Sequence, residues 1–110
     1  MKLIVAIVQD EDAGRLVSEM MDHGFGVTKL ATTGGFLRAG NTTLISGVAD
    51  EKLSEALELI ERICKSREQI TATTTHMSGG ASGVYLPYPI KVTVGGATVF
   101  VLEVSQFLKV

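Results

Sequence analysis

Short apolar runs alternate along the chain with segments in which apolar residues recur every three or four positions. The run KLIVAIV at 2–8 is rich in β-branched residues and is typical of a strand buried on both faces. FGVTKLAT at 25–32 and TTLISGV at 42–48 predict two further strands. Near the C-terminus, IKVTV and TVFVLEV flank Gly95-Gly96, which predicts a hairpin with the glycines in its turn.

Two segments carry the helical period, at 9–24 and 49–69. The first begins with Asp10 as its expected N-cap, has acids in its first turn and closes at Gly24. His23 is expected at the C-terminal end of this helix, where a partial positive charge suits the dipole. The expected buried stripes are Leu16, Val17, Met20 and Met21 in the first helix, and Leu53, Ala56, Leu57, Ile60, Ile63 and Cys64 in the second.

Two stretches fit neither period. A short glycine-rich loop is expected at 33–41, between the second and third strands. The stretch at 70–89, ITATTTHMSGGASGVYLPYP, is rich in Thr and Gly, and its strand alternation is weak. A long loop is therefore expected there, and a loop of about 20 residues in a small domain usually serves function or is disordered.

The element order is strand, helix, strand, strand, helix, then the C-terminal hairpin. This order predicts an α+β fold of the ferredoxin-like sandwich type, with both helices on one face of the sheet. The opposite face would be bare, although the strands are rich in Val, Ile and Leu. We therefore expect this face to pack against copies of the same chain.

Composition narrows the class of protein. The chain has 110 residues, of which 45% are hydrophobic, and we expect one domain over 1–110. Its formal net charge of −2 gives no basic field for nucleic acid or an anionic membrane. The N-terminal apolar run is too short for a signal peptide or a membrane span, and the single cysteine suits a reducing compartment. A soluble, cytoplasmic protein is expected.

Catalytic and metal-binding patterns find little support in the sequence. His76 falls in the long loop, and Cys64 lies on the apolar stripe of the second helix, so it is expected to be a core residue. Local spacing assembles no Ser-His-Asp, Cys-His or paired-carboxylate arrangement and no His/Cys metal cluster. The sequence predicts a protein that is not an enzyme and that needs no cofactor.

The segment TTGGFLRAGNTTL at 32–44 carries the strongest sign of a ligand site. Gly34-Gly35 exposes backbone N–H groups that can approach an anion, although neither a Walker loop nor a dinucleotide fingerprint is present. Phe36 offers a ring for stacking on a base, and Asn41 can pair in a bidentate way with an adenine edge. A ring, an amide, backbone donors and threonine hydroxyls together describe a nucleotide pocket.

Three longer segments resemble the PII-like cyclic di-AMP receptors of the PstA or DarA type. They are KLIVAIVQD, TKLATTGGFLRAGNTTL and YPIKVTVGGATVFV. The resemblance implies a homotrimer that binds one cyclic di-AMP in each cleft between subunits, acts in signal transduction and contacts an unidentified downstream protein. It also implies ligand contacts. Thr28 would hydrogen-bond at the phosphate, Asn41 would read the base edge, and Gly47 would permit close approach. Gly35, Phe36 and Leu37 would enclose an adenine, and Phe100 would contact a base.

The chain departs from that family at Gly24-Phe25-Gly26, where better known members resemble Asn-Phe-Arg, and at Lys109, where they carry Gln. Losing one charge-assisted hydrogen bond to a phosphate weakens binding by about 10–100-fold. The alternative is therefore a diverged paralogue that binds another nucleotide or none. An enzyme acting on a small nucleotide is the third hypothesis.

Overall fold

The computed structural model describes residues 1–30, 40–76 and 85–110. Their elements, in chain order, are β1 (Lys2–Gln9), α1 (Asp10–Asp22), β2 (Thr28–Leu30), β3 (Asn41–Val48), a short 3₁₀ turn η1 (Asp50–Lys52), α2 (Leu53–Cys64), β4 (Arg67–His76), β5 (Tyr85–Val94) and β6 (Ala97–Glu103).

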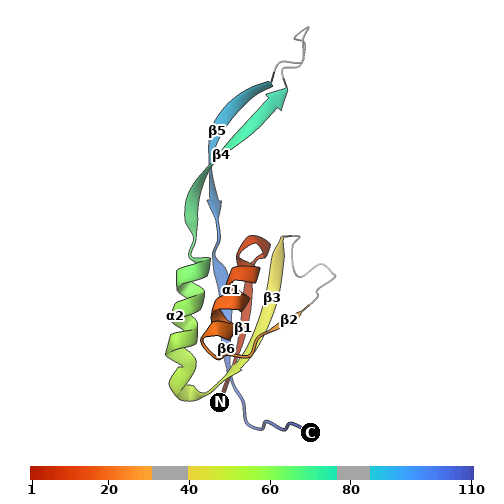
Figure 1. Ribbon diagram of the computed structural model, residues 1–110, viewed down its shortest axis with the longest axis vertical. Helices are drawn as coiled ribbons and strands as arrows, with labels where there is room; N and C mark the ends of the chain where they lie inside the picture. Colours follow the sequence, from red (N-terminus) through yellow and green to blue (C-terminus); the bar gives the residue numbers. More distant parts are fainter. Residues whose placement is uncertain (31–39, 77–84) are drawn as a thin grey trace.

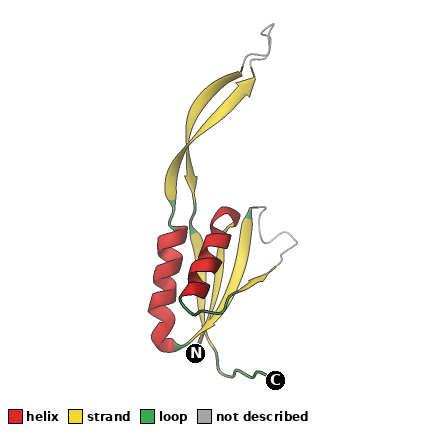
Figure 2. Ribbon diagram, in the orientation of Figure 1, coloured by secondary structure: helices red, strands yellow, loops and turns green. Residues whose placement is uncertain are grey.

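Four strands form one antiparallel sheet in the order β2-β3-β1-β6. Both helices lie on the same face of this sheet (Figures 1 and 2). A small domain with two helices on an antiparallel sheet fits the ferredoxin-like class expected from the sequence.

The core lies between this sheet and the helices. Along β1, the buried residues Ile4, Ala6 and Val8 alternate with half-buried ones, so one side of the strand faces the helices. Leu16 and Ile60 bring the apolar stripes of α1 and α2 onto that side. The whole buried apolar cluster is Ile4, Ala6, Val8, Ala13, Leu16, Met20, Phe25, Leu44, Val48, Ala56, Leu59, Ile60, Ile63 and Cys64.

Helix α1 ends at the predicted place and for the predicted reason. Gly24 has φ +86° and donates its N–H to the Met21 carbonyl at 3.0 Å, while Phe25 donates to the Met20 carbonyl at 2.9 Å. This pair of bonds is a Schellman motif, and the buried Phe25 and Met20 belong to the same apolar cluster.

The start of α1 differs by one residue from the sequence prediction. Gln9 is the N-cap and Asp10 is the first helical residue. The Asp10 carboxylate accepts a hydrogen bond from the Thr42 hydroxyl, and its N–H donates to the Gly40 carbonyl at 2.8 Å. These two bonds fasten the start of the helix to the start of β3.

The expected long loop at 70–89 is wrong for most of its length. Arg67–His76 and Tyr85–Val94 pair as an antiparallel hairpin, which forms a sheet of its own. Pro87 and Pro89 have no backbone N–H to donate to a partner strand. In a two-stranded ribbon each strand has one edge that faces away from its partner, and a proline there costs no interstrand hydrogen bond. The hairpin, here called the arm, projects away from the helices and the main sheet (Figure 1).

The predicted C-terminal hairpin is also wrong. β5 pairs with β4 in the arm, whereas β6 pairs with β1 in the main sheet. Gly95 and Gly96, with φ +84° and +93°, therefore form a corner between two sheets. The second predicted helix is shorter than expected, because α2 stops at Cys64 and β4 begins three residues later.

Candidate functional site

The face of the main sheet that the helices leave uncovered is formed by alternate residues of each strand. One row across the sheet consists of Phe100 in β6, Val5 in β1, Ile45 in β3 and Thr28 in β2. In the next row, Leu102 of β6 pairs with Leu3 of β1, which pairs with Gly47 of β3. We call this surface the open face.

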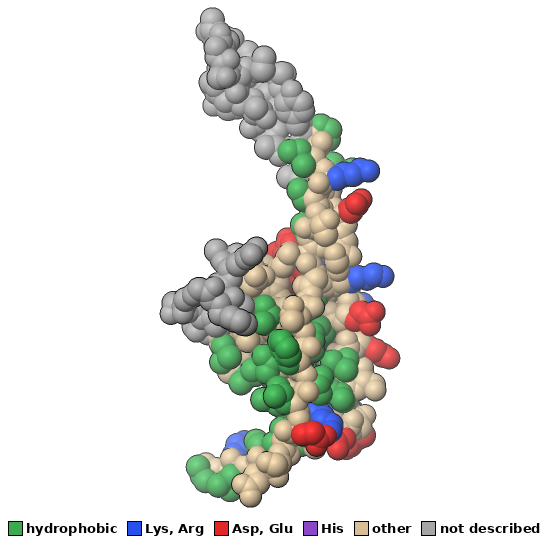
Figure 3. All heavy atoms as spheres, turned by 180° about the vertical axis from the view of Figure 1, so that it is seen from behind, with side chains coloured by type: hydrophobic (Ala, Val, Ile, Leu, Met, Phe, Trp, Pro, Cys, Tyr) green, Lys and Arg blue, Asp and Glu red, His purple; other side chains and the backbone are tan. Residues whose placement is uncertain are grey.

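The open face is largely apolar. Phe100 and Leu102 are 53% and 47% exposed, and Leu3, Val5, Ile7 and Ile45 are half-buried. Seen from behind, hydrophobic side chains gather over the main sheet (Figure 3). The prediction of an apolar sheet face that the chain's own helices do not cover is confirmed. Contiguous apolar surface of this kind marks a place of association.

The four described residues that the sequence nominated for the ligand all belong to this face. Thr28 pairs with Ile45, so it is a diagonal neighbour of Gly47, at a Cα separation of about 7–8 Å. Asn41 and Gly47 stand at opposite ends of β3, about 20 Å apart at the usual rise per residue. Phe100 lies three strands from Thr28, about 14 Å across the sheet. Gly35, Phe36 and Leu37 lie outside the described residues.

The nominated residues therefore form two groups on one chain. Gly47 lies at one end, where its backbone is exposed and an added Cβ would come within 3.0 Å of the Met1 side chain, and Thr28 lies one row closer to the middle, opposite Ile45. Asn41 lies at the other end, beside the root of the arm. The structure does not bring the two groups into one pocket of a single chain.

A cavity of about 380 Å³ surrounds the Asn41 end of the open face. Its lining residues are Ile7, Gln9, Asn41, Gly95, Gly96, Ala97 and Thr98. Gly40, with φ +99°, and the bonds of Asp10 described above set the position of Asn41. Sequence reasoning missed Gln9 and Thr98. They meet Asn41 only through the pairing of β1 with β3 and β6, which no local motif encodes.

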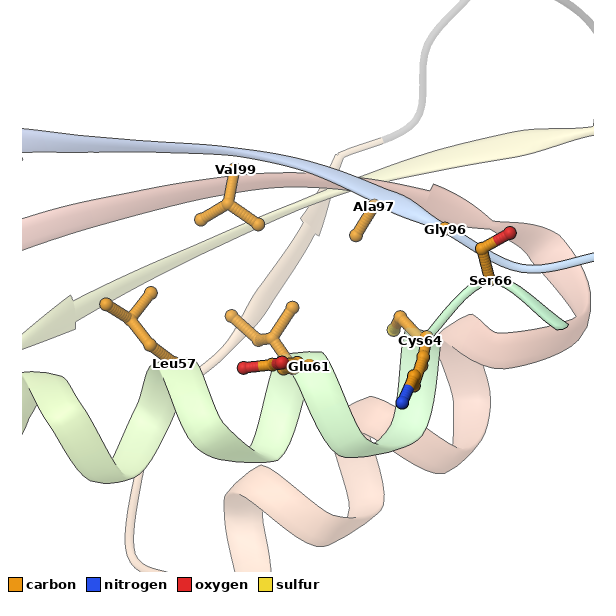
Figure 4. Close-up of a pocket in the computed structure, with 9 residues that line it drawn as sticks. Leu57, Glu61, Cys64, Ser66, Gly96, Ala97 and Val99 are labelled. Atoms are coloured by element: carbon orange, nitrogen blue, oxygen red, sulfur yellow. The ribbon is translucent and has the colours of Figure 1, made fainter.

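A second cavity, of about 330 Å³, lies between α2 and β6 and has mostly apolar walls. Figure 4 shows Leu57, Glu61 and Cys64 on the helix facing Ala97 and Val99 on the strand. Of the four described candidate ligand residues, Thr28, Asn41, Gly47 and Phe100, none lines it.

Cys64, in this second cavity, is a buried free thiol, as the sequence predicted. Burial, together with the nearby Asp12 carboxylate, raises the pKa of the thiol to about 11. Nucleophilic catalysis needs the thiolate, which is scarce at neutral pH when the pKa is so high.

We expect the Cys64 thiol to react with iodoacetamide at pH 8 about 100-fold more slowly in the folded protein than in urea, because two pKa units separate it from an ordinary thiol. The folded state holds this proton more tightly. Stability should therefore fall as the pH rises from about 9 towards 11. Mass spectrometry of the alkylated fraction measures the rate, and equal rates in the two states would contradict the burial of Cys64.

An ion pair joins the core to the root of the arm. Arg67, the first residue of β4, donates to both carboxylate oxygens of Asp12, at 2.8 and 3.3 Å. Asp12 is buried, and its carboxylate raises the pKa of the Arg67 guanidinium. A two-point contact of this kind fixes direction as well as distance, so the pair orients the first strand of the arm.

The remaining titratable residues have structural contacts. His23 is the C-cap of α1, as predicted, and its Nδ1 lies 3.1 Å from the Glu55 carboxylate. This hydrogen bond lowers the pKa of Glu55. His76 is the last residue of β4. In the part of the chain that the structure describes, no three His, Cys, Asp or Glu side chains gather as a metal site. Within the same part, no helix has the length and hydropathy needed to cross a membrane.

Comparison with known proteins agrees with this architecture. A family model described as "Cyclic-di-AMP receptor" matches residues 1–110. Among solved structures, the chain is similar to "a functionally unknown protein from Pediococcus pentosaceus ATCC 25745", with 45% sequence identity and a TM-score of 0.78. That match covers 99% of this chain and 96% of the other. The resemblance seen in the sequence is thus confirmed, and the chain belongs to the cyclic-di-AMP receptor family, which supports cyclic di-AMP as its ligand.

Proposed function

We propose that this chain is a non-enzymatic signal-transduction protein that binds cyclic di-AMP in the clefts between the subunits of a homotrimer. Ligand binding acts on the 33–41 loop and the arm, which then contact a downstream protein. The observation that carries this proposal is that the four described candidate ligand residues lie on one exposed apolar face, spread over about 20 Å along β3.

The open face supports self-association. Phe100 and Leu102 are about half exposed in the single chain, next to the half-buried Leu3 and Val5. A second and third copy of the same face would remove this surface from water, which is favourable by about 25 cal/mol per Å² of apolar area. A closed ring of three identical chains buries each copy in the same way.

The separation between the two ends of the face supports a shared ligand site. Along β3, Asn41 lies about 20 Å from Gly47 and about 13 Å from Ile45, the partner of Thr28. In a ring, the Asn41 end of one subunit meets the Thr28 end of the next. One cyclic dinucleotide can then touch both groups, and three chains form three equal sites.

The chemistry of these residues suits the two parts of the ligand. The Thr28 hydroxyl donates to a phosphate, and the Asn41 amide both donates to and accepts from an adenine edge. Phe100 offers a half-exposed ring for a base. Gly35, Phe36 and Leu37 complete the adenine wall in this proposal, and Gly47 lets the ligand approach the backbone.

The described lining of the cavity beside Asn41 is suited to binding a nucleotide. Among the residues that the structure describes, the cavity beside Asn41 is lined by apolar groups, amides, glycines and one hydroxyl, and by no carboxylate or imidazole. Cleavage of a phosphodiester needs a general base or a metal ion.

We expect Thr28→Ala and Asn41→Ala each to weaken cyclic di-AMP binding by about 10–100-fold, through loss of one charge-assisted or bidentate contact. Each variant should sediment as the wild type does. When the two variants are co-expressed, one of the three sites in each mixed trimer, or about a quarter of all sites, combines an intact Thr28 with an intact Asn41 from different chains. Calorimetric titration of the mixed trimers should therefore recover tight sites that neither variant has alone.

Recovery of tight binding in the mixed trimers would indicate that two subunits share each site, rather than one chain forming it alone. If mixed trimers bind as weakly as the parents, the site does not lie between subunits. Met21→Asp, on an exposed position of α1, is the control that should change neither affinity nor assembly.

A further inference from the structure

We infer that Gln9 is a further ligand-binding residue of the Asn41 end, and that its side chain links the bound nucleotide to the root of the arm. The inference rests on the proposed function, because it concerns the same site.

Gln9 and Asn41 form one side of the cavity beside the arm. Gln9 is the last residue of β1 and pairs directly with Asn41, the first residue of β3, so both side chains belong to the open face. Thr98 of β6 lines the same cavity of about 380 Å³. Two amides and a hydroxyl therefore surround one space that is large enough for part of a nucleotide.

The hydrogen bonding fixes which end of the Gln9 amide a ligand meets. The Gly95 N–H donates to Gln9 Oε1 at 2.7 Å. Because a backbone N–H can only donate, the amide oxygen must be the atom that faces Gly95. The Nε2 amino group, with its two donors, is then the part of Gln9 that can serve a molecule in the cavity.

Two backbone donors at the corner, those of Gly95 and Gly96, are already used. Gly95 donates to Gln9, and Gly96 donates to the Cys64 carbonyl. At this corner the side chains, Gln9 among them, supply further donors for a ligand. A cyclic dinucleotide carries acceptors that match them, namely the phosphate oxygens and the ring nitrogens of adenine.

Gln9 also touches the point where the arm leaves the main sheet. Gly95 has φ +84°, and an added Cβ would lie 2.7 Å from the Lys65 carbonyl oxygen, so the corner is closely packed. A ligand that immobilises the Gln9 amide also strengthens its bond to Gly95. Ligand binding in the cavity is thereby coupled to the arm through the Gln9 side chain.

Gln9→Glu separates the two roles of the residue. The carboxylate still accepts the Gly95 N–H, but it offers no amino group and places a negative charge against the phosphates. We expect this variant to bind cyclic di-AMP at least tenfold more weakly than the wild type, with the Gly95 amide protected from hydrogen exchange as in the wild type without ligand. Gln9→Ala should lose both affinity and protection. In the wild type, cyclic di-AMP should slow exchange at Gly95 further.

Calorimetry, hydrogen exchange and sedimentation together decide the outcome. If the wild type binds and Gln9→Glu binds within twofold of it, Gln9 only supports the corner and this inference is overturned, while the proposed function stands. If Gln9→Glu loses its assembly along with its affinity, the effect is not a ligand contact and the inference is likewise overturned. If the wild type itself shows no binding, the proposed function fails and the inference fails with it.

Discussion

Replacing Val5 by aspartate is expected to leave the protein monomeric and to abolish saturable binding of cyclic di-AMP. Val5 lies in the middle of the open face, between Ile45 and Phe100 in the same row. In the proposed trimer, three copies of the introduced carboxylate would be buried near one another. Burying one unpaired charge costs several kcal/mol, and like charges add to that cost.

The single chain should tolerate Val5→Asp, because the helices do not cover this face and water can solvate the carboxylate. Circular dichroism should therefore show a folded protein, while sedimentation velocity shows a third of the wild-type mass. Met21→Asp places the same charge on α1, where Met21 is 60% exposed, and should leave the assembly intact. A Val5→Asp protein that sediments like the wild type would show that the open face is not the subunit interface.

Gly95→Ala is expected to lower the free energy of unfolding by about 2–5 kcal/mol, the largest stability effect that we predict for a single methyl group. About 1–2 kcal/mol comes from the left-handed backbone, since Gly95 has φ +84°. The remainder comes from contact, because the new Cβ would lie 2.7 Å from the Lys65 carbonyl and 3.1 Å from that of Cys64. Both contacts are to backbone, which cannot rotate away.

Gly96→Ala is the matched control. Gly96 has φ +93°, but no atom lies within 4 Å of its added Cβ, so only the backbone cost of about 1–2 kcal/mol applies. Gly26→Ala has open space and no positive φ, and it should be close to neutral. Urea unfolding of the three variants measures the differences. Equal losses for Gly95→Ala and Gly96→Ala would mean that the corner is not packed as the structure has it.

The elements that could be predicted from the sequence are those whose apolar period reflects packing inside the chain. The apolar run in 2–8 and the stripes through Leu16 and Ile60 report one shared core, so β1, α1 and α2 follow from it, although only one face of β1 is buried and not both as expected. The arm could not be predicted in this way. Its strands pair with each other and carry exposed residues such as Ile70, Ile90 and Val92, so no buried face imposes a period on them.

The Gly95-Gly96 corner was missed for a related reason. Two glycines between alternating strands are typical of a hairpin turn, yet here their N–H groups bond to Gln9 and Cys64, which are far away in the sequence. Long-range partners of this kind override local turn chemistry.

The candidate site could be predicted by residue type but not by arrangement. Residue chemistry points to Asn41, and the resemblance to a family adds Thr28 and Phe100; the strand pairing places all three on the open face. Their separation depends on strand order and register. Gln9 could not be predicted as a site residue for the same reason, because it becomes a neighbour of Asn41 only when β1 and β3 pair.

The central claim is that this chain binds cyclic di-AMP between its subunits, and calorimetric titration of the purified protein with cyclic di-AMP tests it most directly. Cyclic di-GMP and ATP serve as control ligands. We predict saturable binding of one cyclic di-AMP per chain, with much weaker responses to both controls, in a protein that sediments as a trimer. Absence of heat at high cyclic di-AMP concentration would contradict the claim. It would point instead to a diverged paralogue in which Gly24 and Gly26 have removed the phosphate contacts.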